Sequence, residues 1–345
     1  MKHVKQHPGG LFLSATLLFL GLLASAVEAQ TPAEIQAALD AAYTKYQNLD
    51  EGANADYIPA LAAVDSNIYG IALVTADGKV YTAGDIESEV SIQSISKVFT
   101  LALVMDEKGV DTILNTIGAD ATGMRFNSIV SVEWSKKGLG GPEMNSLVNP
   151  GAIATTSMVE GDSREAIWNS ILNTYSEFAG RPLSVNQEVF KSEAETNQRN
   201  QAIGYLMYAY GYIKDDPMRA TDIYTEQCSV NVNARDLATM AGTLANHGKN
   251  PVTGKQVMKS ENVPELLAVM ATAGLYDDSG KWLYRTGLPA KSGVGGGIIA
   301  VSPGKFGIAV ISPRLDEAGN SVRAQLAIAD ISNALHGNPL DTNRQ

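Results

Sequence analysis

The sequence predicts an α+β protein, in which one antiparallel sheet takes its strands from both chain ends and a helical subdomain is inserted between them. Segments of β-rich composition occur near the two ends, and the long stretch between them is rich in Ala, Leu and Met. Strands at both ends that enclose helices imply a single sheet with flanking helices. Residues 30–345 then form one domain, with a sheet-containing part over about 30–93 and 271–345 and a helical part over about 94–270.

The first predicted element is a helix that begins near Pro32. Thr31 and Glu34 have the spacing of a capping box, and a proline suits the first helical position. Ile35, Leu39, Tyr43 and Tyr46 follow at helical spacing. This segment is therefore expected to be an amphipathic helix.

A β-hairpin is predicted next. The β-rich runs Ile68–Val74 and Val80–Tyr81 lie on either side of Asp77-Gly78, a dipeptide typical of tight turns between antiparallel strands. The helical stretch begins near Ser94 and includes segments such as Gln201–Tyr210.

The C-terminal part returns to strand-like sequence. Residues 297–302 and 306–312 read as two strands around Pro303-Gly304, and a last helix is expected from about Ser321 to Leu335. These strands are the predicted partners of the N-terminal hairpin in the antiparallel sheet.

The first 29 residues have the pattern of a secretory signal peptide. Lys2 and Lys5 precede an apolar run over residues 11–26, and Val27 and Ala29 have the small side chains of a cleavage site after Ala29. A membrane anchor is the alternative, but the run is shorter than the roughly 20 residues that span a bilayer. The sequence predicts a periplasmic or secreted protein, with no stable membrane insertion after cleavage.

Composition excludes several classes of function. The formal net charge of -11 argues against a nucleic-acid-binding protein, which needs a basic face for phosphates. A single cysteine, Cys228, forms no intrachain disulfide and no CxxC motif, and it is interpreted as a buried apolar residue. Too few His and Cys residues remain for a zinc site, so no metal is predicted.

The histidine count also constrains catalysis. Only His247 and His336 remain after the predicted cleavage, and each precedes a glycine at what reads as a helix C-terminus. A structural role explains both residues, so a Ser-His-Asp mechanism is disfavoured.

Ser94 and Lys97 form a Ser-x-x-Lys motif. Residues three apart on a helix share one face, and a neutral lysine there could take the proton of the serine hydroxyl. Free lysine titrates near pH 10.4, so burial or a second cation must lower the pKa of Lys97. Taken alone, such a motif is more often part of a solvated helix face.

A second motif occurs at Lys291-Ser292-Gly293, at the start of the C-terminal strand region. Ser-x-x-Lys followed by Lys-Ser-Gly on a late strand is the arrangement of the penicillin-recognising serine hydrolases. Lys291 could supply the second cation, and the strand edge could supply backbone N–H groups for an oxyanion. The triplet Ser229-Val230-Asn231 matches a further Ser-x-Asn motif of these enzymes, but it is too short to be assigned a role.

From about Tyr69 to Ile331 the sequence closely resembles the serine-dependent glutaminase family, which shares the β-lactamase-like fold. The order and spacing of several stretches carry the resemblance: residues 92–99, 126–129, 148–153, 192–193, 199–200, 290–294 and 319–321. The resemblance implies a β-lactamase/penicillin-binding-protein-like fold and an amidohydrolase that converts L-glutamine to L-glutamate and ammonia. It also implies no metal or organic cofactor, and a homo-oligomer, either a tetramer or a dimer.

The resemblance implies a role for individual residues. Ser94 becomes the nucleophile, Lys97 its base, and Tyr276 a residue that assists proton transfer. The backbone of Val294 completes an oxyanion hole with that of Ser94. The substrate contacts carried over by the resemblance are Gln93, Ser94, Asn149, Glu193, Asn200, Tyr224, Tyr276 and Val294.

Two other functions remain open at this point. One is a β-lactam-interacting hydrolase or transpeptidase on the same fold, and the other is a sensor that binds or acylates without turnover. Release of ammonia from glutamine would distinguish a glutaminase from both, and rapid loss of a β-lactam would identify the first alternative.

Overall fold

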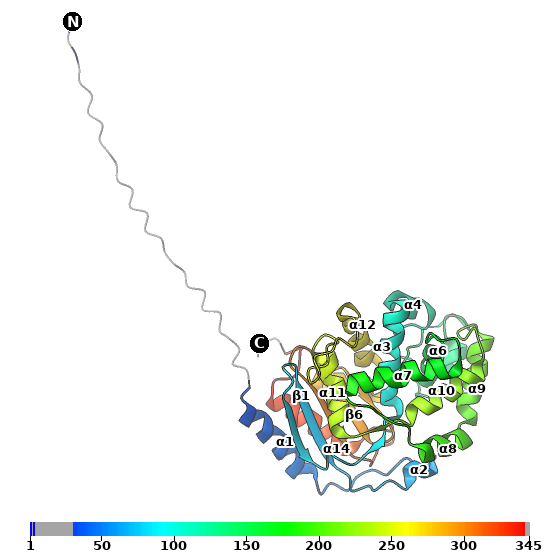
Figure 1. The fold of residues 1–345 in the computed structure, drawn as a ribbon, viewed down its shortest axis with the longest axis horizontal. Coiled ribbons are helices and arrows are strands. Elements are labelled where there is room, and N and C mark those ends of the chain that lie inside the picture. Colours follow the sequence, from blue (N-terminus) through cyan, green and yellow to red (C-terminus); the bar gives the residue numbers. More distant parts are fainter. Residues whose placement is uncertain (2, 4–29, 142, 342–345) are drawn as a thin grey trace.

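The computed structural model describes residues 1, 3, 30–141 and 143–341 (Figure 1). The predicted signal peptide and its cleavage site lie outside the described residues, except for Met1 and His3. The helices are α1 (Pro32–Tyr46), α2 (Pro59–Ala62), α3 (Ser96–Lys108), α4 (Val110–Thr116), α5 (Val130–Trp134), α6 (Asn149–Thr156), α7 (Arg164–Ala179), α8 (Gln187–Thr196), α9 (Gln198–Ala209), α10 (Pro217–Cys228), α11 (Ala234–Ala245), α12 (Val263–Ala273), α13 (Ser279–Thr286) and α14 (Val322–Ala334). The strands are β1 (Gly70–Thr75), β2 (Val80–Gly84), β3 (Val90–Ser91), β4 (Asn231–Val232), β5 (Ala290–Ser292), β6 (Gly297–Ser302) and β7 (Phe306–Ile311), and three short 3-10 helices are η1 (Gln93–Ile95), η2 (Ser260–Asn262) and η3 (Tyr276–Asp278).

The main sheet is antiparallel throughout and has the strand order β2-β1-β7-β6-β5. Strand β1 from the N-terminal part pairs with β7 from the C-terminal part, with Ile71 opposite Val310. The prediction of one sheet built from both chain ends is therefore confirmed. The β1–β2 hairpin, the β6–β7 hairpin and helices α1 and α14 lie where the local sequence patterns predicted them.

The sheet separates two hydrophobic layers because successive side chains on a strand point to opposite faces. Ile71 and Leu73 of β1 belong to the core beneath α1 and α14, whereas Ala72 and Val74 belong to the core on the opposite face. Figure 1 shows α1 and α14 together on one side of the sheet, while α11 lies across β1 and β7 on the other. Helix α11, which belongs to the inserted helical part, therefore packs directly on this face of the sheet.

The remaining inserted helices surround α3. This helix contacts α6, α7 and α12, and its N-terminal residues from Ser96 to Ala102 are all buried. Its first turn lies next to the edge strand β5, because η1 contacts both β5 and α3. The N-terminus of α3 is therefore held at the junction between the sheet and the helical part.

A two-stranded ladder of β3 and β4 fixes the chain just before α3. Val90 pairs with Val232 and Ser91 with Asn231, and Ile92 N–H donates to the carbonyl of Val230 at 2.8 Å. These strands are too short to be recognised from sequence patterns. The Ser-x-Asn triplet that sequence analysis left without a role thus supports the segment that leads into Ser94.

The two histidines that remain after the predicted cleavage lie just beyond the ends of helices. His247 and His336 have φ values of 54° and 50°, and they lie two residues beyond the ends of α11 and α14. The left-handed conformation at such positions commonly ends a helix. The structural interpretation of both residues is consistent with this geometry.

Among residues 30–141 and 143–341, no helix is long and apolar enough to cross a bilayer, and no grouping of His, Cys, Asp and Glu could hold a metal ion.

Candidate active site

Ser94 lies in η1, in the turn that connects the β3–β4 ladder to α3. The preceding residue, Gln93, has a φ of 49°, so the backbone bends sharply at this point. A positive φ costs free energy for a residue with a side chain and persists only where surrounding contacts enforce it. The ladder on one side and the buried first turn of α3 on the other supply these contacts. Ser94 is 7% exposed and faces a cavity.

Lys97 lies three residues after Ser94 and is almost completely buried. Its Nζ donates hydrogen bonds to Asn149 Oδ1 at 2.6 Å and to the carbonyl of Leu147 at 3.2 Å. Burial disfavours the charged form and lowers the pKa of Lys97 to about 8. A substantial fraction of Lys97 is therefore neutral in mildly alkaline solution and able to accept a proton.

Lys291 on β5 is the second buried lysine of the site. Its Nζ donates to the carbonyl of Ser292 at 2.6 Å and lies 4.1 Å from the ring centroid of Tyr276. Burial and the charge of Lys97 hold the pKa of Lys291 well below its usual range. The two lysine charges disfavour each other, so the expectation that Lys291 and burial together lower the pKa of Lys97 stays a prediction. Burial is the largest cause of the lowered pKa at Lys97.

Tyr276 brings a phenol close to Ser94 from a strained turn. It has a φ of 54°, and its ring packs against Phe126 with 4.8 Å between centroids. Its hydroxyl donates to the carbonyl of Ser292 at 3.2 Å. Burial raises the pKa of Tyr276 to about 12, while hydrogen bonds with Ser94 and Ser292 oppose that rise. Tyr276 is thus a neutral hydrogen-bonding group beside the Ser94 hydroxyl.

Asn149, Asn200 and Tyr224 form a connected polar wall. Asn149 Oδ1 accepts from Lys97 and from the Tyr224 hydroxyl at 3.1 Å, and its Nδ2 donates to Asn200 Oδ1 at 2.9 Å. Residues from α3, α6, α9 and α10 are thereby brought together, although they are far apart in the sequence. This network orients the amide of Asn149, since its oxygen faces two donors.

Glu193 supplies a buried carboxylate on α8. It is 7% exposed, and its Oε2 accepts a hydrogen bond from Gln93 Nε2 at 3.2 Å. Burial raises the pKa of Glu193 to about 7, and the hydrogen bond from Gln93 and the charge of Lys97 oppose the rise. A carboxylate this poorly compensated favours a cationic ligand group.

Val294 lies in the glycine-rich loop between β5 and β6, which packs against the segment from Ser91 to Ile95. A Cβ atom at Gly295 would lie only 2.4 Å from the Ser91 carbonyl oxygen, and one at Gly293 would lie 2.8 Å from that of Ile92. Only glycine permits this close approach. The loop therefore places Val294 in the wall of the cavity that Ser94 faces.

These residues surround a cavity of about 300 Å³. Of the predicted site residues, Gln93, Ser94, Asn149, Glu193, Asn200, Tyr224 and Val294 line it. Lys97 and Tyr276 are not in its wall but contact residues that are, through the hydrogen bonds described above. The structure thus gathers every predicted site residue at one place.

Sequence reasoning missed other lining residues, notably Tyr57, Phe126, Asn127 and Arg199. Three of these lie in stretches that carried the resemblance, and Arg199 Nε donates to the carbonyl of Asn127 at 2.9 Å. Tyr57 lies in a loop before α2, and no local pattern in the sequence marks it.

The complete cavity and the residues behind it combine a serine hydroxyl, a lysine with a lowered pKa, a phenol, a carboxylate and several amides. Such a set is suited to acyl transfer on a small zwitterionic amide.

Comparisons with known proteins show similarity to proteins named as glutaminases. The family model described as Glutaminase matches residues 52–338. The chain is 55% identical over 304 residues to a glutaminase of Colwellia psychrerythraea, covering 88% of this chain and 96% of the relative. It is 50% identical to a glutaminase of Brucella canis, covering 90% and 96%.

Solved structures show the same similarity in three dimensions. A probable glutaminase, ybaS, superposes with a TM-score of 0.88 at 47% identity, covering 90% of this chain and all of that one. The glutamate form of Mglu superposes with a TM-score of 0.84 at 34% identity, covering 90% of this chain and 71% of that one.

Proposed function

The chain belongs to the glutaminase family, and we propose that it hydrolyses L-glutamine to L-glutamate and ammonia through an acyl-enzyme on Ser94. The observation that carries the proposal is the cavity in which Ser94 faces a buried carboxylate, Glu193. A glutamine molecule has a side-chain amide at one end and an ammonium at the other. The cavity offers a nucleophile for the first and a counter-ion for the second.

The reaction begins with attack of Ser94 Oγ on the side-chain carbonyl carbon. Neutral Lys97 takes up the serine proton, directly or through the hydroxyl of Tyr276, which hydrogen-bonds with Ser94. The carbonyl oxygen becomes an oxyanion, which the backbone N–H groups of Ser94 and Val294 stabilise. The close packing of the glycine-rich loop on the Ser91–Ser94 segment supports this arrangement of the two donors.

Collapse of the tetrahedral intermediate breaks the carbon–nitrogen bond. Ammonia leaves with a proton delivered by Tyr276 or Lys97, and a water molecule then hydrolyses the serine ester to release glutamate. Because the pKa of Tyr276 is about 12, this residue keeps its proton near neutral pH and can donate it to the leaving nitrogen. The proton balance over the two steps closes without an added cofactor.

Recognition of the amino acid end rests on Glu193. Charge-assisted hydrogen bonds from an ammonium to a carboxylate contribute about 1.5–3 kcal/mol each. The amides of Asn149 and Asn200 suit the substrate carboxylate and side-chain amide, since an amide both donates and accepts. The enzyme is therefore expected to hydrolyse glutamine, to hydrolyse N-acetyl-glutamine much more slowly, and to leave β-lactams uncleaved.

The test of the nucleophile is the Ser94→Ala variant, measured by ammonia release from glutamine. Activity should fall by several powers of ten, as is usual when a nucleophile is removed. Ser91→Ala and Ser96→Ala are matched controls that should keep most activity, because neither serine has a lysine three residues later. If folded Ser94→Ala retains more than about a hundredth of the rate, covalent catalysis at Ser94 is wrong.

We further propose that the enzyme is exported to the periplasm or beyond the cell after cleavage at Ala29. The pattern of residues 2–29 supports this location, and among the described residues the first helix begins at Pro32, just after the proposed cut. N-terminal sequencing of protein recovered from cell fractions should begin at Gln30. Recovery of full-length protein in the cytoplasm would contradict the proposal.

We also propose that the enzyme is a homo-oligomer, as a dimer or a tetramer. Exposed apolar side chains support self-association, because burying them against a second copy would remove them from water. Trp134 and Leu139 are two such residues. Lys137, which lies between them in the sequence, donates a hydrogen bond to the carbonyl of Gly211 and lies over the ring of Tyr212. Light scattering on the purified protein gives the mass directly, and a monomer at micromolar concentration would refute the proposal.

A further inference from the structure

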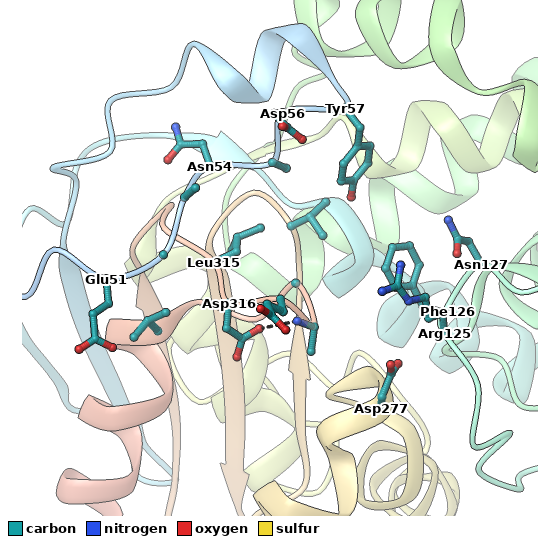
Figure 2. A pocket seen from close by; sticks show the side chains of 18 residues that line it. Glu51, Asn54, Asp56, Tyr57, Arg125, Phe126, Asn127, Asp277, Leu315 and Asp316 are labelled. Atoms are coloured by element: carbon teal, nitrogen blue, oxygen red, sulfur yellow. Dashed lines mark hydrogen bonds between the residues drawn. The ribbon is translucent and has the colours of Figure 1, made fainter.

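A second cavity, of about 720 Å³, adjoins the reaction cavity. We call it the vestibule; it is lined by residues 51–57, 125–127, 277, 294, 315–319 and 322. The two cavities share Tyr57, Phe126, Asn127 and Val294, so they meet along one wall. Figure 2 shows Tyr57 and Phe126 at one side of the vestibule, with Asp277 pointing into it. Glutamine does not need the vestibule. The seven predicted residues that line the reaction cavity already surround a space of about 300 Å³.

The vestibule lies on the leaving-group side of the proposed reaction. A Cβ atom at Gly319 in its wall would be 3.6 Å from Val294 Cγ1 and 3.7 Å from Tyr276 Cε2. These are the residues assigned to the oxyanion and to proton transfer to the leaving nitrogen. Glu193, which is proposed to bind the substrate ammonium, lines only the reaction cavity. A substituent on the amide nitrogen would therefore extend into the vestibule.

The charged side chains that line the vestibule determine which charge a substituent on the amide nitrogen should carry. Five carboxylates line it, from Glu51, Asp56, Asp277, Asp316 and Glu317, against the single guanidinium of Arg125. The Asp316 carboxylate accepts hydrogen bonds from its own loop and from a glutamine side chain on α14. Among the residues that the structure describes, no side-chain hydrogen bond or salt bridge engages the other four. An amine in this space would lie in a field of opposite sign.

We propose that the enzyme also hydrolyses N-substituted γ-glutamyl amides whose amine portion carries a second positive charge, with that portion seated in the vestibule. The proposal rests on the proposed function, because the glutamyl half would be held and acylated as glutamine is. The Ser94 oxygen forms an ester bond with the amide carbon, and the carbon–nitrogen bond breaks. The serine proton passes to the departing amine through Lys97 or Tyr276, and water hydrolyses the ester to glutamate.

The experiment compares three N-substituted glutamines of similar length that differ in terminal charge. N5-(4-aminobutyl)-L-glutamine is cationic, N5-pentyl-L-glutamine is neutral, and N5-(3-carboxypropyl)-L-glutamine is anionic. The value of kcat/KM for glutamate release should decrease in that order. Raising the ionic strength should narrow the differences, since the four free carboxylates are exposed to solvent.

The variants locate the effect. Asp56→Asn combined with Glu317→Gln should lower the preference for the cationic over the neutral substrate by about two- to fivefold per carboxylate, as exposed charge pairs usually contribute. Glu265→Gln is the matched control, an exposed carboxylate on α12 outside the vestibule. Both variants should hydrolyse glutamine at the wild-type rate.

The outcomes separate the two proposals. If the wild type hydrolyses glutamine but none of the substituted amides, the vestibule proposal is wrong and the proposed function stands. A preference that Glu265→Gln reduces as much as the double variant, or equal rates on the cationic and neutral substrates, also overturns the vestibule proposal. Failure to hydrolyse glutamine itself would overturn both.

Discussion

The pH dependence of glutamine hydrolysis should be governed by two buried groups with displaced pKa values. Burial lowers the pKa of Lys97 to about 8 and raises that of Glu193 to about 7. In the proposed mechanism Lys97 acts as a base only when neutral, and Glu193 binds the substrate ammonium only when ionised. Both active forms become more populated as the pH rises. The value of kcat/KM should therefore increase through this range.

The magnitude follows from the two titrations. The fraction of enzyme with neutral Lys97 and ionised Glu193 is about 0.7 at pH 8.5, about 0.05 at pH 7 and about 0.001 at pH 6. We thus expect roughly a 15-fold loss of kcat/KM from pH 8.5 to pH 7, and a loss of several hundredfold by pH 6. On a logarithmic plot the slope should approach two below pH 7 and one just above it.

The assay is ammonia release at limiting glutamine and constant ionic strength. Glu193→Gln removes the lower titration, so its slope below pH 7 should fall to one, while its KM for glutamine rises. A wild-type profile that is flat or decreasing between pH 6 and pH 8.5 would refute the reasoning about both groups. A Glu193→Gln profile that keeps a slope of two would assign the lower titration to another residue.

Other variants test separate parts of the structure. Lys97→Arg should be nearly inactive at every pH up to 9, because an arginine does not deprotonate there; an active variant would show that only a fixed positive charge is needed. Gly295→Ala places a Cβ atom 2.4 Å from the Ser91 carbonyl oxygen, so the loop must move by close to 1 Å and kcat should fall about 100-fold. Gly280→Ala, where no atom lies within 4 Å, is its control, and equal activities would contradict the proposed oxyanion hole. At pH 8, Glu193→Gln should raise the free energy of unfolding by up to about 3 kcal/mol, because burial raises the pKa of Glu193 and the ionised carboxylate therefore destabilises the fold above pH 7. Urea unfolding measures this change. An unchanged or lower unfolding midpoint would contradict the cost of burying the carboxylate.

Much of the fold was predictable because its elements are defined by short-range patterns. The capping box at Thr31, the turn at Asp77-Gly78 and the strands around Pro303-Gly304 each act within a few residues. The pairing of strands from both chain ends then followed from where the strands occur. The β3–β4 ladder was missed because two-residue strands have no periodicity to detect.

The candidate site was partly predictable for the same reason. Ser94 and Lys97 are one helical turn apart, so their proximity is visible in the sequence, and resemblance to a family supplied the more distant residues. Tyr57 and the vestibule had no local signal, since they form only where the loop before α2 meets the segments at 125–127 and 315–319. The burial of both lysines also escaped sequence reasoning, because their separation in the chain says nothing about their desolvation.

The sequence by itself therefore determined the helices and strands that carry a local pattern, among them α1, the two hairpins and α14, and which serine has a lysine one turn away. Only the tertiary structure decided the chemical state of the side chains. Lys97 becomes a usable base and Glu193 a poorly compensated carboxylate because residues from α6, α8, α9 and α10 exclude water around them. Desolvation depends on everything within a few ångströms of a group, and in a folded chain most of those neighbours come from distant parts of the sequence.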